Sequence, residues 1–508
     1  MANSSHGKGL YFVEHFTIRP LVIFFLLASF HTVAIAQERF SGNPVLVEAI
    51  NYPNELQEPP VSDPMADLLE RLKQSEERIA DLEKLAAEME PPSDKSEEKK
   101  SEEKKPEEKK EEKKKEKSWF EKYKLSGYTQ FRINEVVAED PESAPAMHNG
   151  DGSVAENNSF LIRRARLVFE GEVTDRIYIY FQPDFAASVP NSPDANQFVQ
   201  IRDWYADLHF DESKVYRIRV GQSKIPYGWE NLQSSRNRLP LDRNDAFNSA
   251  ARNERDLGAF FYWTPEYAQD FFKKAVDDNL KGSGNYGVFG IGFYNGQGGS
   301  FREQNDNLHF ITRLTLPHTF SNGQMTEVGV QAYTGNYTVL SAPISPLGVG
   351  ATSRPLGTLE RGNSEGILDQ RIGATWVYYP QPLGFQTEWT VGRGPGLNDA
   401  QTEVVDRPLY GGYAMTMYRY QSKCHGEFWP FFRWAFYDGG YKSELNAPMV
   451  NISEFELGLE WQMTKYLELV SMYTWTERTN TRAINLANTP SYEQFDGDLM
   501  RFQLQVRY

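Results

Sequence analysis

From Lys124 onward, apolar and polar residues alternate with a period of two, as in β-strands whose two faces meet different surroundings. In the first such segment Leu125, Phe131 and Ile133 share one face, while Arg, Gln and Asn side chains occupy the other. A water-soluble sandwich also alternates in this way. Here, however, the polar face keeps Arg, Gln and Glu through whole segments, which is typical of a membrane barrel with lipid outside and water inside.

Sixteen such strands are expected between residues 118 and 508, joined alternately by short turns and by long Gly- and Asn-rich loops. Their expected starts lie near residues 124, 160, 177, 200, 215, 257, 286, 308, 326, 371, 384, 409, 427, 453, 467 and 498. Aromatic residues gather at the strand ends, where barrels place amphipathic rings at headgroup depth. The pattern predicts an all-β fold: a transmembrane 16-stranded antiparallel outer-membrane β-barrel, wide enough for an aqueous channel.

The beginning of the chain has a different pattern, that of a targeting segment. An apolar run from Leu21 to Phe30 is followed by Ala34 and Ala36, spaced as in a cleavage site. This predicts a signal peptide over residues 1–36, with an uncleaved anchor helix as the alternative, and places the mature chain outside the cytoplasm. Residues 37–64 follow as a polar lead segment with several prolines.

A heptad pattern occupies residues 65–90. Apolar positions from Met65 to Met89 alternate steps of three and four residues, which predicts a short coiled coil; a single amphipathic helix on a globular surface is the alternative. Residues 91–117 are rich in Lys and Glu and predict a solvated linker. Because a short coiled coil needs partner chains, we expect a homotrimer whose N-terminal region is periplasmic.

Charge and composition exclude several classes of function. The 508-residue chain has a net charge of −16, which argues against nucleic acid as a partner. Its single Cys cannot form an intrachain disulfide or a thiolate metal cage. The few His residues lie in no recognisable nucleophile motif, so we expect no enzymatic activity, no catalytic residues, no metal site and no cofactor.

Arginines recur on the polar face of the strands, and we expect them to line the pore. Such a ladder offers phosphate bidentate hydrogen bonds. The loop 226–256 is the expected constriction, but its arginines and carboxylates nearly balance, so pairing within the protein and contact with ions are equally open for each arginine. The expected anion path contains Arg132, Arg164, Arg166, Arg219 and Arg313 on strands, and Arg236, Arg238 and Arg243 in the loop.

Several stretches resemble strands of the phosphate-selective porin O/P family. The segment from Phe160 to Gly171 contains Arg-Arg-Ala-Arg-Leu, which is similar to one strand of that family. The segments 180–186, 202–207 and 219–226 follow in the family's order. The resemblance is sharpest over residues 120–265, and it implies a trimeric 16-stranded outer-membrane channel with an arginine-lined path for anions.

Two further residues join the expected path by their position in these motifs. The resemblance implies that Asp203 and Lys224 flank the ion path. Asp203 lies on the polar phase of its strand, whereas Lys224 is out of phase with Arg219. A bulge or the start of the loop must therefore turn Lys224 inward.

These features together predict an outer-membrane porin, surrounded by outer-membrane lipid, for passive diffusion of small anions, with phosphate or polyphosphate as candidates. Residues 118–508 carry 36 basic and 46 acidic side chains, so anion preference depends on the local arginines rather than on net charge. Two alternatives stay open. One is a general non-selective porin, and the other is a structural barrel that tethers the outer membrane to the cell wall through its coiled coil.

Overall fold

The computed structural model describes residues 119–154, 160–188, 197–340, 365–401, 403–481 and 493–508. The predicted signal peptide, lead segment, coiled coil and linker all lie outside these residues. The strands are β1 (Tyr123–Glu139), β2 (Leu161–Thr174), β3 (Ile177–Ser188), β4 (Gln197–His209), β5 (Tyr216–Lys224), β6 (Arg255–Trp263), β7 (Phe289–Tyr294), β8 (His309–Thr319), β9 (Met325–Tyr337), β10 (Ile367–Tyr378), β11 (Leu383–Leu397), β12 (Val404–Tyr418), β13 (Tyr420–Ser422), β14 (Gly426–Gly440), β15 (Met449–Gln462), β16 (Leu467–Asn480) and β17 (Glu493–Arg507). The helices are η1 (Trp119–Lys122), α3 (Trp229–Leu232), α4 (Asp245–Asn248), η2 (Arg252–Glu254) and α5 (Glu266–Asp277).

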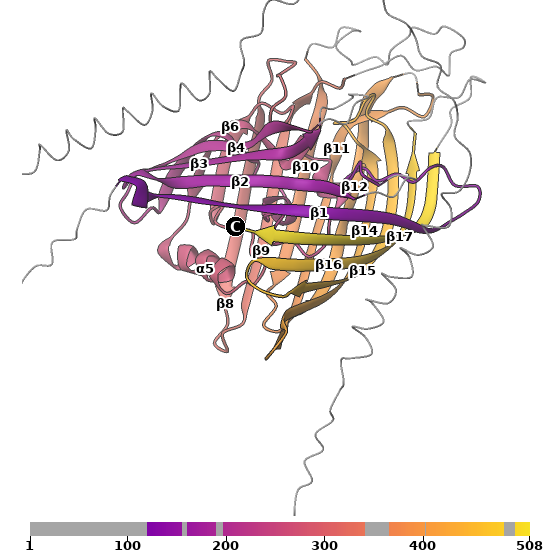
Figure 1. Cartoon of the computed structure of the whole chain (residues 1–508). Coiled ribbons are helices and arrows are strands. Elements are labelled where there is room, and N and C mark those ends of the chain that lie inside the picture. Colours follow the sequence, from indigo (N-terminus) through magenta and orange to yellow (C-terminus); the bar gives the residue numbers. More distant parts are fainter. Residues whose placement is uncertain (1–118, 155–159, 189–196, 341–364, 402, 482–492) are drawn as a thin grey trace, which may run out of the picture. The chain divides into compact units, whose positions relative to one another are not determined.

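The strands form one closed antiparallel barrel (Figure 1). Each strand pairs with the next along the chain, and β1 also pairs with β17. The short β13 continues the pairing of β12 with β14 after a break at Arg419. We therefore count β12 and β13 as one strand of the wall, or stave, and the barrel has sixteen staves, as predicted. Every stave begins within five residues of its expected start, because the alternation that marks each strand is imposed by lipid on one side and the lumen on the other.

The closing seam joins the two ends of the described chain. The amide of Gly127 donates to the carbonyl of Tyr508 at 2.7 Å, and the amide of Tyr508 donates back to the carbonyl of Gly127 at 3.0 Å. A side chain at position 127 would collide with the Tyr508 ring, because a Cβ there would lie 2.4 Å from it. The last residue therefore packs directly over a glycine of the first strand.

The two faces of the wall differ as the alternation predicts. Outward-facing Leu125 and Trp204 are 69% and 60% exposed, as suits side chains that meet lipid. Inward-facing polar residues such as Arg132 and Arg433 are only 1% exposed. Inward side chains are buried because two segments of the chain fill much of the lumen.

The first of these inner segments is the loop 225–254 between β5 and β6, which carries α3, α4 and η2. The second is the segment 264–288 between β6 and β7, which carries α5 and lies at the end of the barrel where the other links are short turns (Figure 1). Among the described residues, no helix has the length and apolar character needed to cross a membrane.

Candidate functional site

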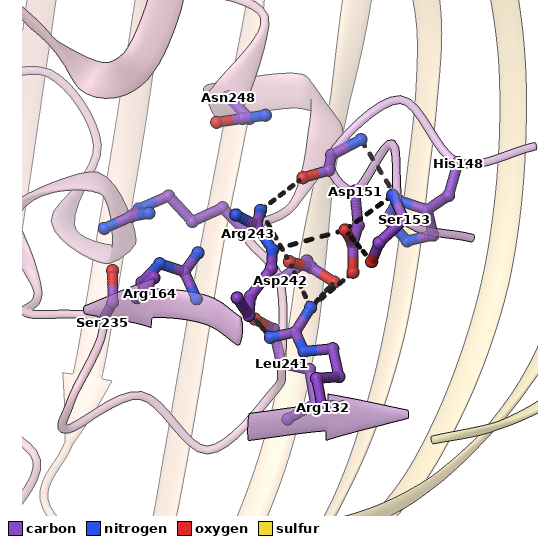
Figure 2. Close-up of polar contacts among 12 residues, drawn as sticks. Arg132, His148, Asp151, Ser153, Arg164, Ser235, Leu241, Asp242, Arg243 and Asn248 are labelled. Carbon is purple, nitrogen blue, oxygen red and sulfur yellow. Dashed lines mark hydrogen bonds and ion pairs between the residues drawn. The ribbon is translucent and has the colours of Figure 1, made fainter. Parts of the chain in front are cut away.

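The loop 225–254 is fixed to the inner wall by ion pairs at its centre (Figure 2). Asp242 lies 3.3 Å from the Arg132 guanidinium of β1 and 2.5 Å from that of Arg501 on β17. Asp151, from the link between β1 and β2, contacts the same two arginines. Arg132, which we expected on the anion path, thus holds the loop in place.

A second set of contacts attaches the start of the loop to the opposite part of the wall. Glu388 of β11 accepts hydrogen bonds from the backbone amides of Trp229 and Glu230 at 2.6 and 2.7 Å. The Glu230 carboxylate lies 2.8 Å from the guanidinium of Arg433 on β14. Arg371 of β10 donates to the carbonyl of Ala246 in α4 at 3.0 Å. The loop therefore lies mainly against β1, β10–β14 and β17, and it touches the β2–β5 wall at fewer points, where Arg202 and Lys224 donate to its backbone carbonyls.

Two of the carboxylates that anchor the loop, Asp242 and Glu254, are stabilised in their charged form. Burial opposes ionisation of Asp242, but Arg132 and Arg501 hold the pKa of its carboxyl well below the usual range. Burial likewise opposes ionisation of Glu254, whose carboxylate lies 2.7 Å from the guanidinium of Arg243. That arginine and Arg255 hold the pKa of Glu254 well below the usual range. Both carboxylates consequently stay ionised at neutral pH.

Between the loop and the β2–β5 wall lies a cavity of about 450 Å³, which we call the loop-end cavity because residues of the long links line its rim. It is lined by seven arginines and only four carboxylates. The lining arginines are Arg163, Arg164, Arg166, Arg202, Arg238, Arg243 and Arg252, and the carboxylates are Asp184, Asp242, Glu254 and Glu444. The cavity is therefore cationic although the barrel domain as a whole is acidic.

Two of the fully buried arginines in this lining form no ion pair with any carboxylate of the described residues. Arg164 donates to the side-chain oxygen of Gln130 at 2.8 Å, and its Nε has no partner. Arg238 donates to the carbonyls of Pro240 and Leu241 at 2.9 and 2.7 Å, and one of its terminal nitrogens has no partner. Burial and the neighbouring Arg243 lower the pKa of Arg238 to about 9, so a bound anion would stabilise its charged form.

Arg166 connects this cavity to a second one, because it lines both. The second has a volume of about 380 Å³, and we call it the turn-end cavity because residues of the link between β6 and β7 line it. Its lining has five basic and three acidic side chains and the tyrosines Tyr178, Tyr180, Tyr205 and Tyr286. The rings of Tyr180 and Tyr205 stack with centroids 5.2 Å apart, and the Arg219 guanidinium lies 3.8 Å from the centre of the Tyr205 ring. The two cavities form a continuous line of cationic and aromatic groups along the β2–β5 wall.

A single glycine explains how Lys224 reaches this line. Arg217 and Arg219 face inward at odd positions of β5, but from Gln222 onward the even positions are buried too. Gly221 between them has φ of +124°, and a Cβ there would lie 2.4 Å from the carbonyl oxygen of Trp204. Since only glycine fits this left-handed conformation, the strand changes phase there and Lys224 turns inward, as the motif position requires.

Seven of the ten expected path residues line the two cavities. They are Arg164, Arg166, Arg238 and Arg243 in the loop-end cavity, and Asp203, Arg219 and Lys224, again with Arg166, in the turn-end cavity. Most are held by partners: Arg166 lies 2.7 Å from Asp184, Arg219 lies 2.7 Å from Asp207, and Asp203 lies 2.9 Å from Arg255. Lys224 donates to two loop carbonyls at 2.8 and 2.9 Å.

The other three lie elsewhere. Arg132 anchors the loop, and Arg236 is partly exposed and lines neither cavity. Arg313 is buried on β8, 3.4 Å from Glu327, and also lines neither cavity. An inward phase on a strand thus does not by itself bring an arginine to the open part of the lumen.

Sequence reasoning missed the tyrosines and the helix α5. Tyr178 and Tyr180 alternate with Ile177, Ile179 and Phe181, so a signal for inward-facing aromatic rings is present in the sequence. For α5 the signal is helical: Ala268, Phe271, Phe272 and Ala275 repeat at steps of three and four after Pro265. No group of three or more His, Cys, Asp or Glu side chains in the described residues is arranged to hold a metal ion.

Several solved porin structures match the chain at low sequence identity and with TM-scores under 0.5. The outer-membrane channel DcaP of Acinetobacter baumannii is 11% identical, with a TM-score of 0.43, and the match covers 76% of this chain and 97% of that one. OmpF of Salmonella typhi, in a complex with daunomycin, is 10% identical with a TM-score of 0.47, covering 76% and 97%. OmpT of Vibrio cholerae in its trimer form is 8% identical with a TM-score of 0.43, covering 76% and 99%.

No curated protein matches the chain significantly. The family model described as phosphate-selective porin O and P matches residues 143–508, which is most of the chain and nearly all of the barrel. The family match therefore extends well beyond the strands whose motifs carried the resemblance. The chain belongs to the phosphate-selective porin O and P family, whose members are outer-membrane porins for passive diffusion.

Proposed function

We propose that this porin passes small oxyanions, phosphate among them, along the β2–β5 wall. The observation that carries the proposal is the pair Arg164 and Arg238, two buried arginines that no carboxylate of the described residues neutralises. A buried charge without an internal partner is costly, and an anion in the loop-end cavity would lower that cost. Guanidinium groups also match the oxygens of phosphate in geometry.

The arrangement also suits release of the ion as well as its capture. Arg166 and Arg219, further along the wall, are already paired with Asp184 and Asp207. Their attraction for a passing anion is consequently partial. Conduction needs sites that are favourable enough to fill and weak enough to empty, and a row of unpaired and half-neutralised arginines meets both needs.

The test replaces the two unneutralised arginines, in the double variant Arg164→Gln and Arg238→Gln. Glutamine keeps hydrogen-bonding capacity and removes the charge. Each charge acting at about 4 Å in water is worth about 1 kcal/mol, so the anion-to-cation permeability ratio should fall about fivefold or more. The readouts are the reversal potential in a potassium chloride gradient and the block of chloride current by phosphate.

A matched control removes two positive charges that carboxylates already neutralise. Arg393 on β11 is exposed and pairs with Asp406, and Arg407 on β12 is partly exposed and pairs with Asp399. The double variant Arg393→Gln and Arg407→Gln should keep the wild-type ratio. A wild-type channel that prefers cations, or equal effects of the two double variants, would show that the unneutralised arginines do not set selectivity and would leave a general porin.

We also propose that the protein is a homotrimer. The support is the heptad from Met65 to Met89, which needs partner chains to bury its apolar seam. Cross-linking in mild detergent should trap three copies, and removal of residues 65–90 should weaken the assembly. A species that stays monomeric at all cross-linker concentrations contradicts the proposal.

The same N-terminal region supports a second role, that of a tether between the outer membrane and the cell wall. The support is the sequence of this region, where a heptad pattern is followed by a Lys/Glu-rich segment that predicts an extended, solvated arm. Deletion of residues 37–117 separates the two roles. Loss of envelope integrity with unchanged conductance supports the tether, and unchanged integrity argues against it.

A further inference from the structure

The segment 264–288 is unusual among the links at its end of the barrel. Other links there are short, such as the steps from Thr174 to Ile177 and from Tyr378 to Leu383. This segment instead carries the 12-residue helix α5. Its length is far greater than a hairpin between β6 and β7 needs, so the additional chain has another structural task.

One face of α5 packs against the inside of the barrel. Ala268, Phe271, Phe272 and Ala275 form a buried apolar cluster with inward-facing residues of β9 and β10 and with Trp229 of the loop 225–254. Within this cluster, the ring centres of Phe271 and Tyr379 lie 5.7 Å apart, and those of Trp229 and Tyr379 lie 6.4 Å apart. The lumen beside these strands is thus filled by apolar side chains rather than water.

Beyond α5 the segment reaches the far wall. The Lys281 ammonium lies 2.5 Å from the Glu460 carboxylate of β15, and both side chains are buried. Asn279 donates to Gln462 at 2.8 Å and to Glu427 of β14 at 3.2 Å. In the barrel order, β14 lies seven staves from β6, and β15 lies seven staves from β7. The segment therefore crosses the mouth nearly along a diameter.

The segment also touches both the loop 225–254 and the open route. Gln233 of that loop donates to the carbonyl of Lys281 at 2.6 Å. On its other edge, Ser283, Asn285 and Tyr286 line the turn-end cavity, and Arg217 of β5 donates to the carbonyl of Asn285 at 2.5 Å. One edge of the segment closes part of the mouth, and the other edge shapes the opening that is left.

We propose that residues 264–288 are a second selectivity element, a turn-end plug that closes the lumen beside β8–β15 and confines permeating anions to the route past Arg219 and Tyr205. The inference rests on the proposed function, because it assigns the plug to the same anion route. It differs from the role of the loop 225–254, which joins β5 to β6 and so enters the lumen from the opposite end of the barrel. Without the plug, the barrel would have a second exit lined by carboxylates such as Glu327 and Glu460.

The decisive experiment replaces residues 266–286 with a short turn in the full-length chain. A 16-stranded barrel leaves an aqueous channel when nothing fills it, so conductance should rise about threefold, and liposome swelling should admit larger neutral sugars. The anion-to-cation ratio should fall toward one, because the new exit is lined by carboxylates. Heat-modifiable migration in gels shows whether the variant has folded.

A milder variant keeps the test decisive if the deletion does not fold. The triple change Asn279→Ala, Lys281→Ala and Glu460→Gln removes the contacts to β15 without leaving a buried unpaired charge, and should raise the size limit in the same direction. The control is Lys273→Ala with Lys274→Ala on the exposed face of α5, where the side chains pair only within the helix. That control should behave as wild type.

The outcomes separate this inference from the proposed function. A folded deletion variant with wild-type conductance and size limit overturns the plug, whatever the selectivity. A wild-type channel without anion preference overturns the proposed function and with it the assignment of the plug to an anion route. In that case an increased size limit in the deletion variant would leave the plug as a size filter alone.

Discussion

Arg433 and Arg164 both stand on the inner face of a strand, and both are almost completely buried. Arg433 lies between Glu230 and Glu456 and also donates to the carbonyl of Asp242. Among the described residues, Arg164 has Gln130 as its one side-chain partner, and it otherwise lines the loop-end cavity. Strand alternation delivers both guanidinium groups to the lumen in the same way, but the position of the loop 225–254 decides whether each becomes an anchor or an anion site.

The comparison explains how an acidic barrel can hold a cationic route. The wall on which the loop lies contains buried carboxylates on several strands, among them Asp369, Glu388 and Glu456, and these are bound by arginines, lysines or backbone amides. The loop touches the β2–β5 wall at fewer points, among them Arg202 and Lys224, so the other arginines of that wall line open cavities. Selectivity here depends on which charges remain unneutralised, and net charge does not report that.

The largest effect is expected for an anchor. Arg433→Met removes the partner of Glu230 and Glu456 and should lower the free energy of unfolding by about 3–5 kcal/mol, because it leaves buried carboxylates uncompensated. Arg164→Met should cost little, since no carboxylate depends on Arg164. Urea unfolding in detergent measures both free energies. Similar losses for the two variants would mean that Arg433 and Arg164 do not differ in their contribution to stability.

A second change should convert anchors into anion sites. Asp242→Asn removes the carboxylate shared by Arg132 and Arg501 while it keeps the side-chain volume. Loss of the charge-assisted contacts should cost about 1.5–3 kcal/mol of stability, and the freed positive charge should raise the anion-to-cation ratio. Reversal potentials measure the anion-to-cation ratio, and urea unfolding measures the stability. A lower anion preference in this variant would contradict the view that a carboxylate partner keeps an arginine from attracting anions.

A smaller effect is expected at the rim of the loop-end cavity. The Arg252 guanidinium lies 3.5 Å from the centre of the Phe301 ring. Arg252→Ala should reduce stability by about 0.5–1 kcal/mol, the usual size of an exposed cation–π contact. It should lower anion preference less than the change at Arg164 and Arg238 does. Phe301→Leu is the matched control, because it removes the ring and keeps the charge.

The smallest effect is expected when the pH is lowered from 8 to 5. Asp242 and Glu254 have pKa values well below the usual range, so the stability they supply is complete above the unfolded values of about 4 and is lost as pH falls through their folded values. These two carboxylates should therefore supply the same stability at every pH from 8 to 5. Urea unfolding in detergent should show a constant difference between the wild type and Asp242→Asn over this range, and a difference that shrinks within it would mean that Asp242 titrates there.

The sequence predicts the barrel well because lipid and water act on every strand in the same way. Stave number and strand starts need only the alternation of residues, and the inward position of Lys224 follows once Gly221 is allowed to change the phase. The partners of the interior arginines could not be predicted, since they depend on where the loop 225–254 comes to rest. Arg132 and Arg164 are indistinguishable in sequence pattern, and only the placement of Asp242 separates them.

Helix α5 shows a different limit. Its amphipathic repeat is visible in the sequence, but the alternation on either side favours treating the region as a link between strands. The repeat predicts an apolar face and does not say which surface covers it. That surface consists of Met325, Val377 and Tyr379, which come from strands far along the chain.

The closing seam sets an order for assembly of this chain. The ladder between β1 and β17 joins segments more than 350 residues apart, and such distant contacts form late because so much chain must first be brought together. Until this ladder forms, β1 and β17 have open edges that can pair with other chains. Tyr508 extends the ladder by its two hydrogen bonds with Gly127, and its removal should slow membrane assembly and favour aggregation before it alters conduction.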